Sequence, residues 1–352
     1  MKIKILAIET SFDDTAVAVL EDRKVLSSVV SSSTDLHKKW GGVVPDISRR
    51  AHIENIELVY KEALKRSGLS ISEIDYIAVT YGPGLAIDLE VGLDFAKSLA
   101  KKHSKTLVPV NHMEGHLLSS FLLNSKGKGL IENIEKENLF PAIGVLVSGN
   151  HTELILVSDF GKYVKLGQTL DDAAGEAFDK VGRMLDLGFP GGPIVTEFAK
   201  KGEKGKICFS IPMKTSGDLN FSYSGLKTAC LYKSRELKEE YCKDSEWVYD
   251  FCSGFVDAVA ESIVLKLEKA LCENKNVKSV FAGGGVLMNE YIARKIAMKA
   301  KEFGSNFFLP TKKFRTDNAG MIGVAGYFNI LNGNILSSDI DRDPRLELDT
   351  ST

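Results

Sequence analysis

The feature that most constrains the fold is a pattern that occurs twice, in the same order, in the two halves of the chain. Residues 3–20 contain an apolar strand, a polar turn and a second apolar strand, and residues 142–157 repeat this order. Farther along, an apolar strand that runs into glycines at 74–84 has a counterpart at 277–285. Two such matches in register indicate a duplicated α/β unit.

The turns of both repeats favour nucleotide binding. Backbone N–H groups and small hydroxyls in such turns can face a phosphate, and glycine lets the backbone approach a ligand closely. A single glycine turn is equally well explained as a simple change of chain direction, but four of them in register argue for a shared function. We therefore expect a nucleotide in the cleft between two lobes, where α/β folds generally bind ligands.

Composition limits the classes of partner and compartment. The net charge of the 352-residue chain is −2, so RNA binding must depend on local basic clusters, for which residues 37–50 and 312–315 are the candidates. No apolar run reaches the ~18 residues of a membrane span. The five cysteines form no C-x-x-C pair, which favours a reducing cytoplasm. We expect a cytoplasmic protein that makes no use of a membrane.

The repeat also sets the expected domain boundaries. Residues 1–138 form the first lobe, which contains the first hairpin and a histidine motif, and a charged, glycine-containing linker precedes the second lobe. Residues 139–332 form the second lobe, which contains the nucleotide-binding turns and a helical insertion. Residues 333–352 are polar and acidic, and we expect them to form a loose tail.

The motif "HMEGH" at 112–116 predicts a metal site. On a helix, His112 and His116 lie on one face, one turn apart, and can converge on one ion. Zinc peptidases of the H-E-x-x-H type carry their general base directly after the first histidine, whereas Glu114 is rotated about 200° from His112. The inverted order H-x-x-E-H does not fit either. The spacing thus favours metal binding over peptidase chemistry, although histidines that only pack or cap remain an alternative.

A series of motifs resembles one family, the tRNA adenosine threonylcarbamoyltransferases, formerly described as O-sialoglycoprotein endopeptidases. The resemblance covers roughly residues 3–330. Its motifs are "IETSFDDTAVAV", "GGVVPDISRRAH", "YGPGL", "NHMEGHL", "LVSGNHTEL", "DDAAGEAFDKVGRML", "PGGP", "FSYSGLKTA", "AGGGVLMN" and "TDNAGMIG". The resemblance implies an α/β fold of the duplicated actin-like, sugar-kinase-like ATPase type, with two RNase H-like lobes around a nucleotide cleft.

The resemblance also implies a set of site residues. The metal ligands are His112, His116 and Asp317, a donor set that suits iron(II), with zinc as the alternative. Glu114 is expected to support one of the histidines from behind. The expected nucleotide-binding residues are Leu146, Val147, Ser148, Gly149, Asn150, Asp179, Gly192 and Asn289.

The implied reaction is acyl transfer to tRNA. Threonylcarbamoyl-AMP, made by a separate enzyme, is attacked by the N6 amine of the adenosine adjacent to the anticodon in tRNAs reading ANN codons, and AMP leaves. Our hypothesis for the base that accepts the amine proton is Asp13 or Asp14, and an Asx turn formed by these aspartates remains an alternative. Lys227 is a further candidate for contact with the anionic substrate.

The resemblance implies partners as well. Bacterial members of the family act with a smaller paralogous subunit of the same fold and with a P-loop ATPase, and the turn "SGNHT" favours this bacterial form. Asn150 replaces a glycine that is usual in this turn, so its fit to phosphate is in question. Asp88 and Glu90 stand where small or apolar residues are usual, in a segment that we expect to face a partner.

Three other functions compete with this interpretation. A non-catalytic nucleotide-binding scaffold of the same fold predicts lost metal ligands, yet all three are present. A sugar kinase or ATPase has no use for the histidine pair. A metallopeptidase is disfavoured by the position of Glu114.

Overall fold

The chain divides into two compact units, each assembled from separate stretches of sequence. The computed structural model describes residues 2–240, 246–335 and 340–350. The first unit comprises Met1–Glu137, Ser158–Val164 and Phe308–Thr352, and the second comprises Asn138–Val157 and Lys165–Phe307. The first boundary, between Glu137 and Asn138, lies one residue from the expected one, and the chain re-enters the first unit at Ser158–Val164 and again from Phe308.

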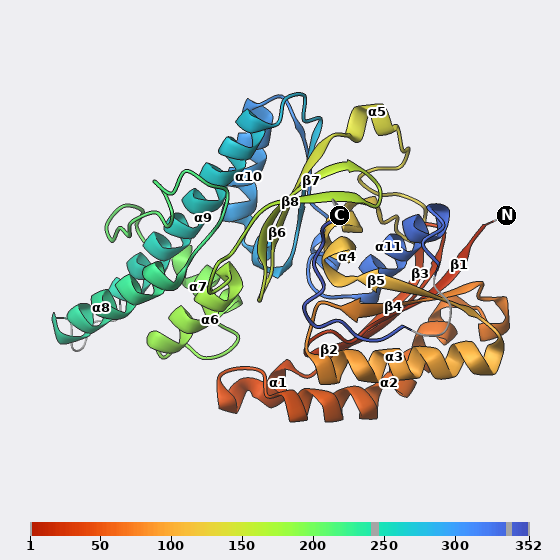
Figure 1. The fold of residues 1–352 in the computed structure, drawn as a ribbon. Coiled ribbons are helices and arrows are strands. Elements are labelled where there is room, and N and C mark those ends of the chain that lie inside the picture. The colour runs from red at the N-terminus through yellow and green to blue at the C-terminus, as the bar shows by residue number, and fades with distance from the viewer. Residues whose placement is uncertain (1, 241–245, 336–339, 351–352) are drawn as a thin grey trace. The chain divides into compact units, whose positions relative to one another are not determined.

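The first unit is built on a five-stranded sheet with the strand order β3-β2-β1-β4-β5. Its central strand, β1, pairs antiparallel with β2 and parallel with β4. Both faces of the sheet are covered, because α2 and α3 pack on one face and α11 on the other (Figure 1). The elements are β1 (Lys4–Glu9), β2 (Asp14–Glu21), β3 (Lys24–Ser32), β4 (Tyr76–Gly82), β5 (Thr106–Asn111), α2 (Pro45–Ser67), α3 (Ala86–His103) and α11 (Ala319–Leu331).

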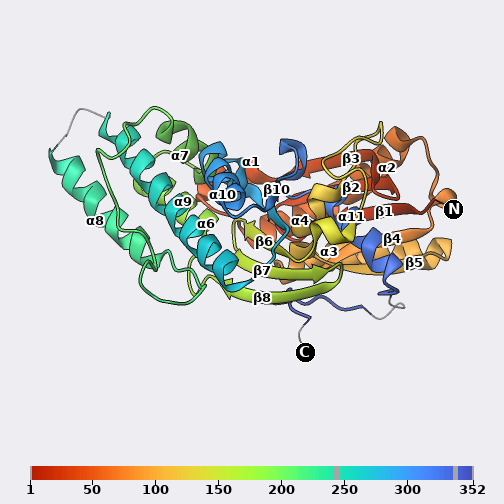
Figure 2. The same cartoon turned by 90° about the horizontal axis from the view of Figure 1, so that it is seen from above.

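The sheet of the second unit has an equivalent order, β8-β7-β6-β9-β10. Its central strand, β6, also pairs antiparallel with the next strand and parallel with the strand that follows a helical segment. The strands β6, β7 and β8 lie side by side (Figure 2). The repeat expected from the sequence is therefore confirmed. The elements are β6 (Ala142–Val147), β7 (Thr152–Asp159), β8 (Lys162–Gln168), β9 (Ser279–Gly283) and β10 (Asn306–Phe308).

Along the chain, the helices of the second unit lie mostly between β8 and β10. Helices α6 to α9 make up the helical insertion expected in the second lobe. Among the described helices of the whole chain, none is both long and apolar enough to cross a membrane. The helices are α6 (Ala174–Met184), α7 (Gly191–Ala199), α8 (Ser224–Glu240), α9 (Trp247–Glu273) and α10 (Glu290–Glu302).

The short described helices of the first unit and its boundary are α1 (Thr34–His37), η1 (Lys38–Trp40), η2 (Ile71–Glu73), α4 (His112–Leu118), η3 (Ser119–Phe121), α5 (Lys136–Leu139) and η5 (Lys312–Phe314). The motif "HMEGH" lies on a helix, α4, which is the condition for its two histidines to share one face.

The end of the chain differs from the loose tail expected there. Within residues 340–350, Ile340 and Leu348 are only 5% and 4% exposed. The backbone N–H of Asp343 donates to the carbonyl of Tyr81 over 2.7 Å. The polar composition gave no indication that two buried apolar side chains, together with backbone hydrogen bonds, would hold the segment in place. Residues 336–339 and 351–352 of the expected tail lie outside the described residues.

Asp88 and Glu90, in the segment expected to face a partner, both form contacts within the first unit. Asp88 is fully buried, and its Oδ2 accepts a hydrogen bond from the Ser48 hydroxyl over 2.9 Å. Glu90 forms an ion pair with Arg342 at 3.0 Å. Burial raises the pKa of Asp88 to about 7, and its Oδ1 has no hydrogen-bond partner among the described residues.

The pKa of Asp88 makes stability depend on pH. The folded-state pKa of about 7 exceeds the ordinary aspartate pKa of 3.8, so the folded state binds more protons between these values, and unfolding becomes easier as pH rises through this window. Asp88→Asn keeps an acceptor for Ser48 without the ionisation. We expect the stability gain of Asp88→Asn over wild type to grow by roughly 2–3 kcal/mol between about pH 5 and about pH 8. Urea unfolding at both pH values measures it, and a pH-independent difference would contradict the assignment.

Candidate active site

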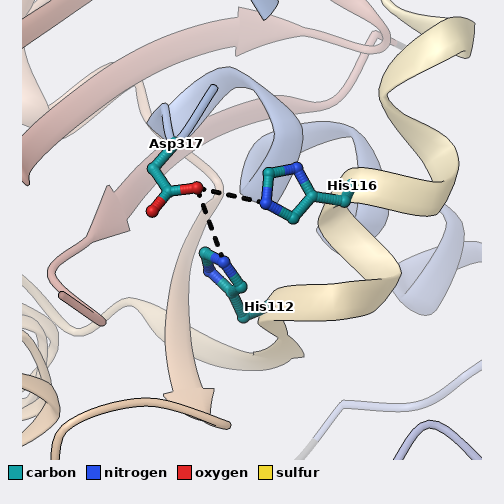
Figure 3. Close-up of side chains that lie close together, drawn as sticks. All are labelled: His112, His116 and Asp317. Atoms are coloured by element: carbon teal, nitrogen blue, oxygen red, sulfur yellow. Dashed lines mark ion pairs between the residues drawn. The ribbon is translucent and has the colours of Figure 1, made fainter. Parts of the chain in front are cut away.

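Helix α4 presents both histidines to the same side (Figure 3). Its N-cap is Asn111, whose side-chain oxygen accepts hydrogen bonds from the backbone N–H groups of Met113 (2.8 Å) and Glu114 (3.4 Å). A Cβ at Gly115 would lie 3.0 Å from Cδ1 of Ile322, so the glycine lets α11 pack closely against α4. This approach brings Asp317, which precedes α11, to the histidines.

The three predicted metal ligands meet in one group that is able to hold a metal ion. Asp317 Oδ1 lies 3.1 Å from His116 Nε2 and 3.6 Å from His112 Nε2, and the candidate ligand atoms are all within 4.8 Å of one another. His116 is fully buried, and neither of its ring nitrogens has a hydrogen bond of acceptable geometry among the described residues. A buried imidazole without partners is costly unless it binds something else. Two imidazoles and a carboxylate are a donor set for iron(II) or zinc.

Glu9, at the end of β1, is a part of this centre that the sequence interpretation missed. It is 1% exposed, and its Oε2 lies 3.1 Å from His112 Nδ1. Thr80 donates its hydroxyl to the same oxygen. Burial alone would lower the pKa of His112, but the Glu9 and Asp317 carboxylates outweigh it and raise the pKa to about 9. A carboxylate on Nδ1 orients the ring and leaves Nε2 for a metal. The available signal was a charged residue at the end of an otherwise apolar strand.

Glu114 does not support a histidine, contrary to expectation. Its carboxylate, 5% exposed, accepts hydrogen bonds from the Tyr163 hydroxyl (2.9 Å) and from the Asn329 amide (3.0 Å). Because it lies about 200° around the helix from His112, it points to the side opposite the metal ligands. The metal side of α4 therefore lacks the general base of an H-E-x-x-H peptidase.

The two aspartates of the first hairpin turn are close enough to Asp317 for its charge to affect them. Burial raises the pKa of Asp13, and it raises the pKa of Asp14 to about 7, with the charges of Asp317 and Glu9 adding to the effect on Asp14. Asp13 accepts a hydrogen bond from the Thr34 hydroxyl over 2.8 Å. Asp14 Oδ1 is buried without a hydrogen-bond partner among the described residues. Asp14 is thus the better placed of the two to accept a proton near neutral pH.

In the second unit, the expected phosphate turn lies between β6 and β7. Leu146 and Val147 are buried strand residues that lead into it, and the carbonyl of Ser148 accepts from the N–H of Gly175 at the start of α6. A Cβ at Gly149 would meet nothing within 4 Å, so its backbone is open to a ligand. Asn150 is exposed and has no positive φ, so replacing glycine causes no backbone strain there.

The remaining expected nucleotide residues gather around the start of α7. Asp179 accepts from the backbone N–H groups of Gly191 (2.8 Å) and Gly192 (3.4 Å), and the position of a Cβ at Gly192 is open. Asn289 caps α10 with its side-chain oxygen, and its amide nitrogen donates to Thr196 of α7 over 3.1 Å. Asn289 therefore caps α10 and also links it to α7.

Lys227 has an internal partner. Its ammonium group lies 2.6 Å from Asp172 Oδ2, and Lys180 contacts the other oxygen of the same carboxylate. These two lysines lower the pKa of Asp172 although burial opposes them. The positive charge of Lys227 is consequently offset by Asp172 before any substrate binds.

Removal of one histidine tests the metal centre. We expect His116→Ala to weaken zinc or iron(II) binding by more than about 100-fold, because losing a ligand costs more than losing a supporting residue. Competition with a chromogenic chelator measures the affinity. His37→Ala removes a fully buried histidine of the same unit outside the trio and should bind metal like wild type. Unchanged affinity in His116→Ala would rule out this site.

Comparison with known sequences matches the chain along almost its full length. The family model described as tRNA N6-adenosine threonylcarbamoyltransferase matches residues 24–324. A protein of that name from Thermosipho africanus is 42% identical over 98% of this chain and 99% of its own length. Another of that name from Thermodesulfovibrio yellowstonii is 45% identical over 94% of this chain and 96% of its own length.

Comparison with solved structures concerns the fold. HypF of T. kodakarensis gives a TM-score of 0.60 at 16% identity, over 96% of this chain and 49% of that one. Component A of the (R)-2-hydroxyglutaryl-CoA dehydratase of Acidaminococcus fermentans gives 0.50 at 15% identity, over 92% and 96%. The predicted fold class, duplicated and of the actin-like, sugar-kinase-like ATPase type, is confirmed. From the family model and the two curated relatives together, the chain belongs to the tRNA N6-adenosine threonylcarbamoyltransferase family, a family of transferases.

Proposed function

We propose that this chain transfers the threonylcarbamoyl group from threonylcarbamoyl-AMP to the N6 amine of the adenosine adjacent to the anticodon in tRNAs reading ANN codons, with release of AMP. The observation that carries the proposal is the His112, His116 and Asp317 trio in a member of this family, with Glu114 on the opposite side of the helix. Such a centre suits the binding of an acyl phosphate better than the cleavage of a peptide.

The proposed set of substrate-binding residues includes residues of each unit. In the second unit, the open backbone at Gly149 and Gly192 suits close contact with a nucleotide, and Asp179 can accept from ribose hydroxyls. Leu146, Val147, Ser148, Asn150 and Asn289 complete this proposed set. In the first unit, the trio would hold iron(II) or zinc, which when bound supplies Lewis-acid stabilisation of acyl and phosphate oxygens.

Proton transfer is assigned to the first hairpin turn. The amine nitrogen forms a bond to the carbamoyl carbon, the bond from that carbon to the phosphate oxygen breaks, and AMP leaves with the electron pair. Asp14 accepts the proton that the amine loses. Its pKa of about 7 leaves a useful fraction ionised at neutral pH and makes it a stronger base than an ordinary aspartate.

The proposed tRNA surface lies on the first unit. Trp40 is 59% exposed with the Lys39 ammonium 5.2 Å from its ring, and Arg49 and Arg50 are exposed nearby in sequence. Such groups can bind phosphates and stack on unpaired bases. Residues 312–315 are the second proposed contact. A smaller paralogous subunit and a P-loop ATPase remain the proposed partners, with the cytoplasm as the proposed compartment.

A direct transfer assay tests the function. Purified protein is mixed with unmodified tRNA, carbamoyl-labelled threonylcarbamoyl-AMP and the candidate partners, and the modified nucleoside is quantified. We expect product from wild type and from the control His103→Ala, and at least about 100-fold less from His112→Ala and Asp317→Ala. Equal product from all four proteins would remove the metal from the mechanism. No product from metal-loaded wild type with any partner combination would favour the scaffold.

The pH profile tests the base. Because Asp14 must be ionised, we expect kcat/KM of wild type to rise with pH and level off above about 7. Asp14→Asn should lower kcat/KM by about 10²–10⁴-fold and abolish this rise. Asp13→Asn should retain the rise, since Asp13 is engaged by Thr34. A rise that persists in Asp14→Asn and disappears in Asp13→Asn would reverse the assignment.

A further inference from the structure

The docked C-terminal segment, Ile340–Thr350, runs past the end of β4 and is named the strap below. Besides the bond from Asp343 to Tyr81, the N–H of Gly84 donates to the carbonyl of Pro344 over 3.3 Å. A Cβ at Gly82 would lie 1.9 Å from the carbonyl oxygen of Asp343, so only glycine permits this approach. The backbone of the strap therefore packs directly against the carboxyl end of β4.

The strap next contacts the residue that caps the metal-binding helix. The side-chain nitrogen of Asn111 donates to the carbonyl of Glu347 over 3.2 Å, while its oxygen caps α4. One amide thus links the strap to the first turn of α4. The strap fixes which way this amide faces, because only its nitrogen can donate to the Glu347 carbonyl.

The strap also holds the tyrosine that bonds to Glu114. The N–H of Thr350 donates to the carbonyl of Tyr163 over 2.8 Å, and the N–H of Tyr163 donates to the Thr350 hydroxyl over 2.8 Å. Tyr163 is 1% exposed, and its hydroxyl reaches Glu114. The other oxygen of Glu114 is held by Asn329 of α11, the helix that follows Asp317. The carboxylate therefore ties the histidine-bearing helix to the element that carries the third ligand.

Two further contacts keep the strap in place. Leu348 and Ile340 are buried, and Ile340 packs into the main core of the first unit. The Arg342–Glu90 ion pair joins the strap to α3. Glu90 lies in the segment that the resemblance led us to expect at a partner surface, and its ion-pair partner lies in the strap.

We propose that the strap is a positioning element of the metal centre. By holding Asn111 at the start of α4 and Tyr163 behind it, the strap sets the position of His112 and His116 relative to Asp317, so that metal affinity depends on a segment that touches no ligand. This inference rests on the proposed metal site, and it assigns to the C-terminal segment a role in building that site.

Metal affinity in full-length variants provides the first test. Leu348→Asp puts a charge into the buried contact of the strap and should weaken Zn²⁺ binding by about 10-fold, the effect expected of a lost supporting contact. Tyr163→Phe removes only the hydroxyl that reaches Glu114 and should weaken it in the same direction. The control, Arg345→Ala, changes an exposed side chain of the strap and should bind like wild type. Should Leu348→Asp fail to fold, Leu348→Ala replaces it.

Hydrogen exchange of the metal-free protein separates this proposal from the metal function. We expect amides of residues 112–118 to exchange faster in Leu348→Asp than in wild type, while those of β6 and β9 in the second unit do not change. If wild type binds no Zn²⁺ but residues 112–118 still exchange faster in Leu348→Asp, the metal site is refuted and the strap remains the support of α4. A folded Leu348→Asp with wild-type exchange and wild-type Zn²⁺ affinity would overturn the strap proposal.

Discussion

The close packing of α4 against α11 is the constraint on which the metal centre depends. Gly115 lies between the two histidines in sequence, and its missing side chain leaves room for Ile322. A Cβ there would lie 3.0 Å from Cδ1 of Ile322 and 3.2 Å from Cγ of Met321, so a larger residue would require these side chains of α11 to shift. The ring of His116 is buried and neither of its nitrogens has a hydrogen bond among the described residues, so the ring gains from binding a ligand such as a metal ion.

Electrostatics explain why a cation suits this part of the first unit. Glu9, Asp13, Asp14 and Asp317 influence one another, and the mutual repulsion of these carboxylates contributes to the raised pKa of Asp14. A divalent cation bound by the trio would compensate this negative charge, and His112 already offsets part of it through its contact with Glu9. Glu114 differs from these acids because two neutral donors, Tyr163 and Asn329, satisfy its carboxylate. Its task is structural, whereas that of Glu9 is to orient a ligand.

Much of this organisation could be predicted from the sequence, because it is encoded in local patterns. The repeated hairpins, the helix of the histidine motif and the grouping of His112 with His116 follow from strand and helix periodicity. Asp317 could be assigned only through the resemblance to a family, since 200 residues separate it from His116 and no periodicity links them.

The contacts that were missed depend on tertiary packing. In the sequence, Glu9 is simply the last residue of a strand, and only the folded structure shows that Thr80 and His112 contact its carboxylate. The strap reads as a polar tail because its binding relies largely on backbone hydrogen bonds, which are independent of side-chain type, and on two apolar residues. Asp88 was expected at a partner surface, but its carboxylate is buried and accepts a hydrogen bond from Ser48 on another helix.

The central claim is that His112, His116 and Asp317 bind a metal that serves transfer of the threonylcarbamoyl group. The most direct measurement is a crystal structure of the metal-loaded protein with a stable analogue of threonylcarbamoyl-AMP, with anomalous scattering to locate the metal. The account predicts one metal bound by His112, His116 and Asp317. A metal bound elsewhere, or an analogue that contacts none of the proposed site residues, would contradict it.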